Sequence, residues 1–415
     1  MNCKLTYTRV TELVQKYGSP LYVFHSDEFR KNYQKLLSSI RAYYHKYNIA
    51  YSYKTNYTPA ICKIVKELGG VAEVVSDMEY RLAKKLGYSD KEIVYNGPVK
   101  GNGLFEHLLN GGVTNIDSLD ELESVVRFAE KHKEKDFSIA FRVNIDIGQG
   151  FISRFGLDAY ADIRDCELNK AFKYARSASN IKVVGLHCHV GRSRSIEAWE
   201  NRVRIMFSLI DRCFDMPPLF IDFGSGMNSV MEPSLAKQFG GDIPTFEEYA
   251  KVVGKTMKDR YGMLPRNLQP ILYTEPGTTL VSGCMSFLGR VESIKNVKGK
   301  DYVTFNCCGG NMGDICQLKN LPISIYSMGA KSQKVSNAAF VGYTCLEHDH
   351  IYEGFSGELA VGDIVQFRNV GSYSNVFKPP FILPNCAMVQ VDNLGDVSLI
   401  KEAEDFDDIF HTYIF

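Results

Sequence analysis

Short apolar runs alternate with amphipathic stretches along roughly the first two thirds of the chain. About eight runs are apolar enough to form buried strands, and residues 58–68, after the first run, carry apolar side chains at helical spacing before Gly69 and Gly70. Strands that alternate with helices usually pair in parallel through right-handed crossovers. The pattern therefore predicts parallel strands at 49–53, 71–75, 92–95, 115–117, 138–144, 183–189, 218–223 and 271–275, with helices at 58–68, 78–86 and 119–131.

The number of these units predicts the fold class, an α/β protein with a (β/α)8 barrel over residues 27–278. A doubly wound open sheet is the alternative, because periodicity alone does not distinguish the two. After about residue 280 the strand pattern continues without long helical patterns, and Gly, Asp and Asn separate the runs. This pattern predicts that residues 279–415, together with residues 1–26, form a β-sandwich or β-barrel domain. Residues 21–24 could pair as a strand in that domain. Its predicted strands are 281–295, 302–307, 338–341, 364–367 and 387–391.

Charge and cysteine content narrow the class of protein. The 48 basic residues balance the 48 acidic ones, and no long basic run suggests a nucleic-acid or membrane partner. The 11 cysteines lack the spacing of a disulfide framework, and no apolar stretch reaches the roughly 18 residues of a membrane span. We expect a cytoplasmic protein with free thiols that acts on a small molecule.

Two polar residues stand at the ends of predicted barrel strands, where barrel enzymes build their active sites. Lys54 follows the strand at 49–53, and a partly desolvated position there favours a nucleophilic amine. Glu275 ends the last barrel strand, and Pro276 and Gly277 turn the chain directly after it. A carboxylate beside a pyridine nitrogen would keep that nitrogen protonated. The ordinary alternatives are a solvent-facing lysine and a structural salt bridge.

Two further strand ends carry candidate binding groups. His187 and His189 in the run 185–191 would point to the same side of a strand, where they could bind a metal or, in the reading we prefer, stack an imidazole on a flat ring. The small residues of 222–226 would let backbone amides approach a phosphate, although a tight turn explains them equally well. We expect no metal site, because neither this run nor the groups Cys307, Cys308 and Cys316 or His348, Asp349 and His350 show standard ligand spacing.

Several motifs, in order along nearly the whole chain, resemble the fold-type III pyridoxal-phosphate decarboxylases, the group of diaminopimelate and ornithine decarboxylases. The motifs are Tyr53-Lys54-Thr55-Asn56, 74–76 with Glu79, 117–122, 142–144 with 154–157, and 185–191. The resemblance implies the two-domain architecture of alanine racemase and pyridoxal 5'-phosphate as the cofactor. It also implies a homodimer with shared active sites and an amino acid as substrate.

The resemblance further implies roles for individual residues. Lys54 would bind the cofactor covalently, His189 would stack on its ring, and Glu275 would pair with the ring nitrogen. Cys345 resembles a cysteine that reaches the site from the partner subunit, where Cys345 or Lys54 would supply a proton. The other residues implied to contact the cofactor are Glu73, Arg142, Ser193, Gly224, Gly226, Gly277 and Tyr373.

The sequence departs from the family pattern at positions near the substrate. Thr278 replaces the arginine of the motif Glu-Pro-Gly-Arg, and Arg192 stands where a small serine is usual. Leu346 follows Cys345 in place of an acidic residue, with Glu347 one step later, and Glu73 stands where aspartate is usual. We therefore predict decarboxylation of a modified or conjugated amino acid rather than a simple diamino acid. The predicted substrate-binding residues are Arg192, Thr278, Glu347 and Asp349.

Two other activities compete with decarboxylation. An amino-acid racemase of the same broad fold would place an arginine at the ring nitrogen, so Glu275 favours the decarboxylase. A non-catalytic relative that binds the cofactor or regulates a partner is the second alternative, and the changes at Thr278 and Leu346 support it.

Overall fold

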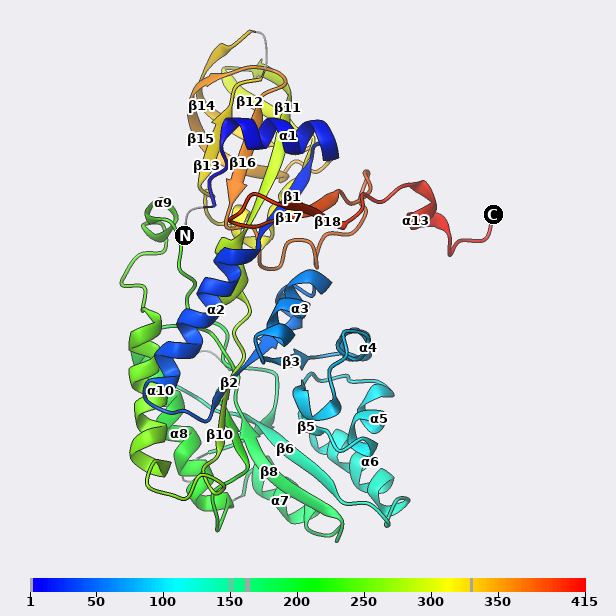
Figure 1. The fold of residues 1–415 in the computed structure, drawn as a ribbon, viewed down its shortest axis with the longest axis vertical. Coiled ribbons are helices and arrows are strands. Elements are labelled where there is room, and N and C mark those ends of the chain that lie inside the picture. The colour runs from blue at the N-terminus through cyan, green and yellow to red at the C-terminus, as the bar shows by residue number, and fades with distance from the viewer. Residues whose placement is uncertain (1–2, 149, 151, 161–164, 329–330) are drawn as a thin grey trace. The chain divides into compact units, whose positions relative to one another are not determined.

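The computed structural model describes residues 3–148, 150, 152–160, 165–328 and 331–415 (Figure 1). Its contacts divide the chain into two compact units. The barrel unit comprises Tyr33–Asn228 and Ile243–Thr279, and the β unit comprises Met1–Asn32, Ser229–Asp242 and Leu280–Phe415. The sequence pattern assigned residues 27–32 and 229–242 to the barrel, whereas their contacts group them with the β unit. No helix in the described ranges is both long and apolar enough to cross a membrane.

Eight parallel strands form the core of the barrel unit. The hydrogen-bonded order is β5-β4-β3-β2-β10-β9-β8-β6, and pairing of β5 with β6 closes the sheet. Closure confirms the barrel and excludes the open sheet. The strands are β2 (Tyr47–Ser52), β3 (Val71–Val74), β4 (Ile93–Tyr95), β5 (Val113–Ile116), β6 (Phe137–Asn144), β8 (Ile181–His187), β9 (Phe220–Asp222) and β10 (Ile271–Thr274), and the short β7 (Leu157–Asp158) pairs with β6.

Helices connect the strands at positions that the sequence pattern largely anticipated. The predicted helix at 58–68 is α3 (Pro59–Glu67), and the one at 119–131 is α6 (Leu119–Glu130). The other helices that lie at least partly in this unit are α2 (Ser26–Arg41), α4 (Asp77–Lys85), α5 (Gly103–Leu109), α7 (Glu167–Ala175), α8 (Ile196–Cys213), α10 (Phe246–Tyr261) and α11 (Thr278–Val281), with the 3-10 turns η1 (Tyr53–Thr55) and η2 (Asp90–Glu92).

Helix caps fix the direction in which the chain leaves two strands. Ser76 begins α4, where its hydroxyl accepts from the backbone N–H of Glu79, and the Glu79 carboxylate accepts from Val75 N in return. Ser118 and Glu121 make the same pair of contacts at the start of α6. Each capping pair satisfies backbone donors at the first helical turn. Both turns lie directly after barrel strands and stabilise the strand ends.

The β unit is built on a sheet with the path β15-β14-β12-β11-β1-β17-β18, to which β16 and β13 add. Strand β1 (Leu21–His25) pairs antiparallel with β11 and parallel with β17, as the sequence suggested for residues 21–24. The remaining strands are β11 (Met285–Val297), β12 (Lys300–Phe305), β13 (Ile323–Tyr326), β14 (Gln333–Val341), β15 (His350–Leu359), β16 (Ile364–Arg368), β17 (Ala387–Val391) and β18 (Val397–Lys401).

Short helices complete the β unit: α1 (Tyr7–Tyr17), α9 (Pro233–Ala236), α12 (Gly309–Met312) and α13 (Phe406–Phe410), with the 3-10 turns η3 (Ser282–Cys284) and η4 (Asp314–Gln317). The strand predicted to begin at residue 281 begins at Met285, because α11 and η3 occupy the preceding residues. A buried cluster that includes Val10 and Leu13 of α1 and Val23 and Val389 of the sheet packs the helix onto β1 and β17.

Candidate active site

A cavity of about 400 Å³ opens within the barrel unit at the carboxyl ends of its strands. Its lining brings together side chains from segments that lie far apart in the sequence. Among them are Lys54, Glu73, Asn96, His189 and Glu275. The sequence predicted four of these five as site residues, and the barrel places them around one volume. This is the geometry of a small-molecule site rather than a set of unrelated strand ends.

Lys54 lies in η1, two residues beyond the end of β2, because the strand ends at Ser52, one residue earlier than predicted. Its ammonium group forms a hydrogen-bonded ion pair with Glu73 Oε2 of β3. The Lys54 side chain is 29% exposed, whereas the Glu73 side chain is completely buried. The lysine therefore faces the cavity while a fixed carboxylate holds its amine.

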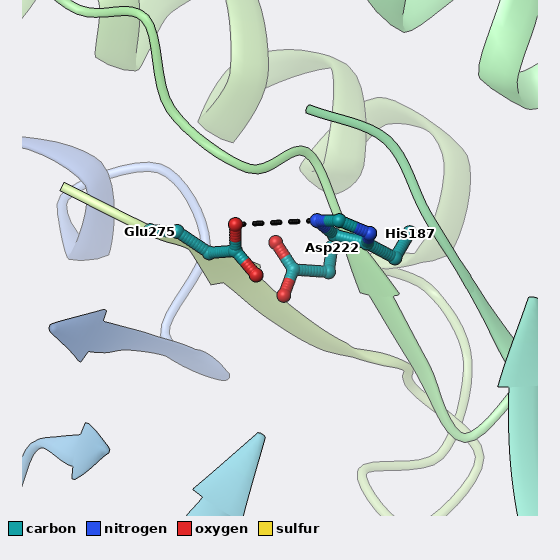
Figure 2. A group of neighbouring side chains, drawn as sticks. All are labelled: His187, Asp222 and Glu275. Carbon is teal, nitrogen blue, oxygen red and sulfur yellow. Dashed lines mark hydrogen bonds and ion pairs between the residues drawn. The ribbon is translucent and has the colours of Figure 1, made fainter. Parts of the chain in front are cut away.

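Glu275 follows β10 and is held through both of its carboxylate oxygens, and Figure 2 shows the contact with His187. Oε1 accepts from Asn96 Nδ2 at 2.5 Å, and Oε2 lies 3.2 Å from His187 Nε2. Burial favours the protonated acid, but the charge and hydrogen bond of His187 and the charge of Lys54 outweigh it and hold the pKa of Glu275 well below its ordinary value. Glu275 is therefore a buried anion in the barrel.

Asp222, at the end of β9, is a second buried carboxyl group beside Glu275 (Figure 2). Its Oδ1 accepts from Gly224 N at 2.8 Å. Burial, and then the negative charge of Glu275, raise the pKa of Asp222 well above its ordinary value. Two like charges this close are not both stable in a low-dielectric interior, so the pair holds one proton and Asp222 is the protonated partner.

His187, Asp222 and Glu275 are also the one group of three metal-binding side chains in the described part of the chain whose ligand atoms lie within 4.8 Å of one another. His189 is not a member, so the two histidines of the 185–191 run do not converge on one ion position. The hydrogen bond between His187 and Glu275 already uses one ligand atom of each. The geometry therefore suits a hydrogen-bonded cluster better than a metal site.

His189 lies just beyond β8 and presents a neutral imidazole. Its Nδ1 accepts a hydrogen bond from the backbone N–H of Ser225 at 3.2 Å, so this nitrogen carries no proton. Burial, followed by the positive charge of Lys54, lowers the pKa of His189 well below its ordinary value. A neutral ring fixed in orientation suits the stacking role predicted from the sequence.

Three glycines pack so closely that a side chain would not fit. Gly224 has a φ of 60°, and a Cβ there would lie 2.6 Å from Cys188 O. Gly226 has a φ of 98°, and its Cβ would lie 2.3 Å from Val190 O. A Cβ on Gly277 would lie 2.0 Å from Thr55 Oγ1. The turn after β9 therefore requires glycine for packing and for its left-handed backbone, and the turn after β10 requires it for packing.

The Gly224→Ala variant is expected to lose about 3 kcal/mol of barrel stability, because the left-handed φ and the collision with the His189 segment both act against it. Urea unfolding followed by fluorescence measures this loss, since the single tryptophan, Trp199, is buried in the barrel unit. Gly69→Ala is the matched control: φ is 76°, but no atom lies within 4 Å of its Cβ. A loss no larger than that of Gly69→Ala would contradict the packing argument.

Arg142 forms part of the cavity wall rather than reaching into the Lys54 ion pair. Its Nη1 lies 3.3 Å from Asp117 Oδ1, and its guanidinium stacks on the ring of Phe155 at 4.7 Å. Arg154 stacks on the same ring at 4.2 Å, and exposed Arg192 also lines the cavity. The cavity wall is thus rich in guanidinium groups, which bind carboxylates and phosphates well.

Two other predicted residues of the barrel unit, Ser193 and Thr278, are half-buried and do not line this cavity. In the β unit, Tyr373 has a φ of 53°, an uncommon conformation for a residue with a side chain, and packs against Phe377. Cys345 and Glu347 are exposed. The roles suggested for these residues stay predictions.

Asp349 of the β unit holds a neighbouring loop through hydrogen bonds. Its carboxylate accepts hydrogen bonds from Gly309 N and from the backbone and hydroxyl of Thr344, at 2.6 to 3.2 Å. These contacts hold the loop that carries Cys345. The substrate contact predicted for Asp349 would have to share a carboxylate that the loop already uses.

Sequence reasoning missed the amide residues that connect the two carboxylates of the cavity. Asn96 Nδ2 donates to Glu73 Oε1 at 2.9 Å as well as to Glu275, and Asn115 Nδ2 donates to Asn96 Oδ1 at 2.7 Å. Asn96 directly follows the apolar strand β4, just as Glu275 directly follows β10. A search for polar residues behind every predicted strand would have found it.

Comparisons with known proteins agree on one family. Residues 28–282 match the family model described as "Pyridoxal-dependent decarboxylase, pyridoxal binding domain". Diaminopimelate decarboxylase of Aquifex aeolicus is 28% identical over 95% of this chain and 92% of that protein, and the enzyme of Methanocaldococcus jannaschii is 26% identical over 96% and 92%. A crystal structure of the M. jannaschii enzyme with L-lysine superposes with a TM-score of 0.83 at 25% identity, covering 98% of this chain and 94% of that one.

An eight-stranded barrel with a lysine and a buried carboxylate in one cavity, joined to a mostly β unit, defines a two-domain barrel enzyme. The chain belongs to the pyridoxal-dependent decarboxylase family. It is a carboxy-lyase that uses pyridoxal 5'-phosphate, and the resemblance seen in its sequence motifs is confirmed. The relatives named above are decarboxylases and give no support to the racemase alternative.

The barrel residues fit this cofactor. An aldehyde requires an amine, and Lys54 lines the cavity. A ring nitrogen that must stay protonated requires an anion, and Glu275 is ionised there while Asp222 carries the proton of the pair. Phosphate oxygens require backbone donors. The N–H groups of Gly226 and Gly277 find no acceptor among the described residues.

Proposed function

We propose that this enzyme decarboxylates a diamino acid of the diaminopimelate kind, with Lys54 and Glu275 as its central groups. The observation that carries the proposal is the meeting of Lys54, Glu73, His189 and Glu275 around one cavity in a chain whose relatives, aligned over most of its length, are diaminopimelate decarboxylases. The same relatives favour a diamino acid over the conjugated amino acid expected from Thr278 and Leu346, so that expectation is corrected.

Each residue of the barrel site has a physical task in this proposal. Lys54 would hold the cofactor through a bond between its amine and the aldehyde carbon, with the aldehyde oxygen leaving as water, and Glu73 would accept the proton that this amine carries in the ion pair. His189 would pack its neutral ring against the cofactor's ring, and Arg142 would contact the cofactor from the cavity wall. Pyridoxal phosphate supplies an electron sink for the pair of electrons left behind when the carboxylate departs as carbon dioxide.

Glu275 determines how strong that sink is. An anion fixed in a buried cavity raises the affinity of a neighbouring ring nitrogen for a proton. Asn96 and His187 hold its two oxygens, so little reorganisation is needed. We propose that Gly224, Gly226 and Gly277, with Ser193 and Tyr373, bind the phosphate.

The arginines of the cavity support a substrate with more than one carboxylate. Arg154 and Arg192 are exposed and line the same volume as Lys54. A guanidinium pairs with a carboxylate through two parallel hydrogen bonds, so these residues suit the distal carboxylate of a diamino dicarboxylic acid. We propose that Arg192 makes this contact beside Thr278, and that Glu347 meets the distal amine.

We further propose a homodimer in the cytoplasm. Cys345 is exposed in the β unit, as a residue that serves a partner subunit would be. All 11 cysteines are thiols rather than members of disulfides, which suits a reducing compartment. In the dimer, Cys345 of one subunit would supply the proton that replaces the lost carboxylate.

A substrate panel tests the proposed function. The holoenzyme is incubated with meso-diaminopimelate, L-lysine, L-ornithine and an Nε-acylated lysine, and carbon dioxide release is measured. We expect kcat/KM for diaminopimelate to exceed the values for the other compounds by at least about 100-fold. Only diaminopimelate has a second, distal carboxylate that can pair with Arg192. Arg192→Gln should narrow that margin. A preference for the acylated lysine, or no carbon dioxide from any member, would contradict the proposal.

A further inference from the structure

Arg202 of α8 is a fully buried arginine that the proposed function does not yet use. Its guanidinium stacks on the Trp199 ring at 4.2 Å. In the described part of the chain, no carboxylate lies within ion-pair distance of it. Burial lowers the pKa of Arg202, which reflects the cost of a cation without water around it. A buried cation without an anionic partner is unfavourable unless a ligand provides one.

The hydrogen bonds of Arg202 all go to the backbone of the glycine turns. Nη1 donates to Phe223 O at 3.0 Å and to Ser225 O at 2.6 Å, and Nη2 donates to Val190 O at 2.9 Å. The carbonyls of Phe223 and Ser225 flank Gly224, and the carbonyl of Val190 directly precedes Gly191. One side chain thus binds the carbonyls of the two segments that follow β8 and β9.

Neighbouring side chains bind the next carbonyls of the same turn. Trp199 Nε1 donates to Gly226 O at 3.3 Å, and Thr279 Oγ1 donates to Met227 O at 2.8 Å. A Cβ placed on Gly226 would lie 3.4 Å from Arg202 Nη2, so the guanidinium lies directly beside this glycine. Side chains of α8 and α11 bind four carbonyls of the turn and Glu275 N binds that of Gly224, whereas the Gly226 N–H has no acceptor among the described residues.

We propose that Arg202 is the cationic positioning residue of the phosphate site, supplying from behind the glycine turn the positive charge that Thr278 does not. The inference rests on the proposed function, in which this turn binds the cofactor's phosphate. Arg202 acts through the turn: it fixes the carbonyls so that the amide of Gly226 is held in place, and its charge stabilises a dianion next to that amide. The phosphate in turn offsets the unfavourable burial of the guanidinium.

Binding of pyridoxal phosphate compared with pyridoxal tests this role without measuring turnover. Apoprotein is titrated with each compound, and binding is followed by ligand absorbance. For Arg202→Gln, which keeps a hydrogen-bond donor but no charge, we expect the affinity for pyridoxal phosphate to fall roughly 10- to 100-fold. The affinity for pyridoxal should change by less than about 3-fold, because this compound has no phosphate.

Two controls separate charge from packing. Arg204→Gln changes an exposed arginine on the same helix and should leave both affinities unchanged. Arg202→Lys keeps the charge and should retain more of the phosphate-specific affinity than Arg202→Gln does. If circular dichroism shows that Arg202→Gln does not fold, Arg202→Lys is compared with wild type instead. We then expect the ratio of the affinity for pyridoxal phosphate to the affinity for pyridoxal to fall by at least about 3-fold, because lysine donates to fewer carbonyls.

The outcomes distinguish this inference from the proposed function. Equal losses for both compounds, or no loss for either, would overturn the role of Arg202 while leaving the cofactor site intact. If Arg192→Gln, rather than Arg202→Gln, loses affinity for pyridoxal phosphate but not for pyridoxal, Arg192 supplies the positive charge of the phosphate site. Wild-type protein that binds neither compound would contradict the proposed function itself.

Discussion

Replacing Lys54 with alanine is expected to abolish covalent attachment of pyridoxal phosphate and to lower kcat by at least about 1,000-fold. No other lysine lines the cavity, as far as its lining is described, so no other amine there would replace it. Borohydride treatment followed by peptide mass spectrometry locates the attached cofactor, and carbon dioxide release gives kcat. Lys63→Ala, an exposed position on α3, serves as the control and should keep full activity.

A second variant separates chemistry from folding. Lys54→Ala leaves the buried Glu73 carboxylate without its cation, which itself destabilises the barrel. Lys54→Arg keeps a positive charge beside Glu73 but carries no amine that can bind an aldehyde covalently. It should fold normally and still show no covalent cofactor. Borohydride-trapped cofactor on a different lysine in either variant would show that Lys54 is not the attachment site.

Replacing Glu275 with glutamine is the second prediction with a large effect. We expect kcat to fall about 100- to 1,000-fold, because a neutral amide no longer stabilises a proton on the ring nitrogen. The amide oxygen can still accept from Asn96, so the barrel should fold. Carbon dioxide release measures kcat, and the absorbance of the bound cofactor shows whether the site is still loaded.

The matched control for this variant is Glu130→Gln, an exposed glutamate at the end of α6. It should leave kcat within about 3-fold of wild type, as expected for a surface change. If Glu275→Gln binds the cofactor and keeps a kcat similar to that of wild type, protonation of the ring nitrogen does not depend on this carboxylate. Loss of cofactor from Glu275→Gln would instead show that Glu275 acts mainly in binding.

The spacing of apolar residues was enough to predict all eight barrel strands to within a few residues. Most residues of these strands are buried, so each strand appears as a short apolar run, and the capped helices between runs have their own period. Strands β13, β15 and β18 were missed for the opposite reason. β15, for example, contains two glycines and two glutamates and has only two buried residues, so its composition resembles that of a loop.

The sequence by itself determined which residues stand at strand ends, and this was sufficient to single out Lys54 and Glu275. It did not determine closure of the barrel, which depends on the pairing of β5 with β6. The partners of the site residues were decided by closure as well. Asn96 and Asp222 become partners of Glu275 only when the register of parallel strands brings their side chains into one interior, since neither spacing nor composition encodes distances between strands.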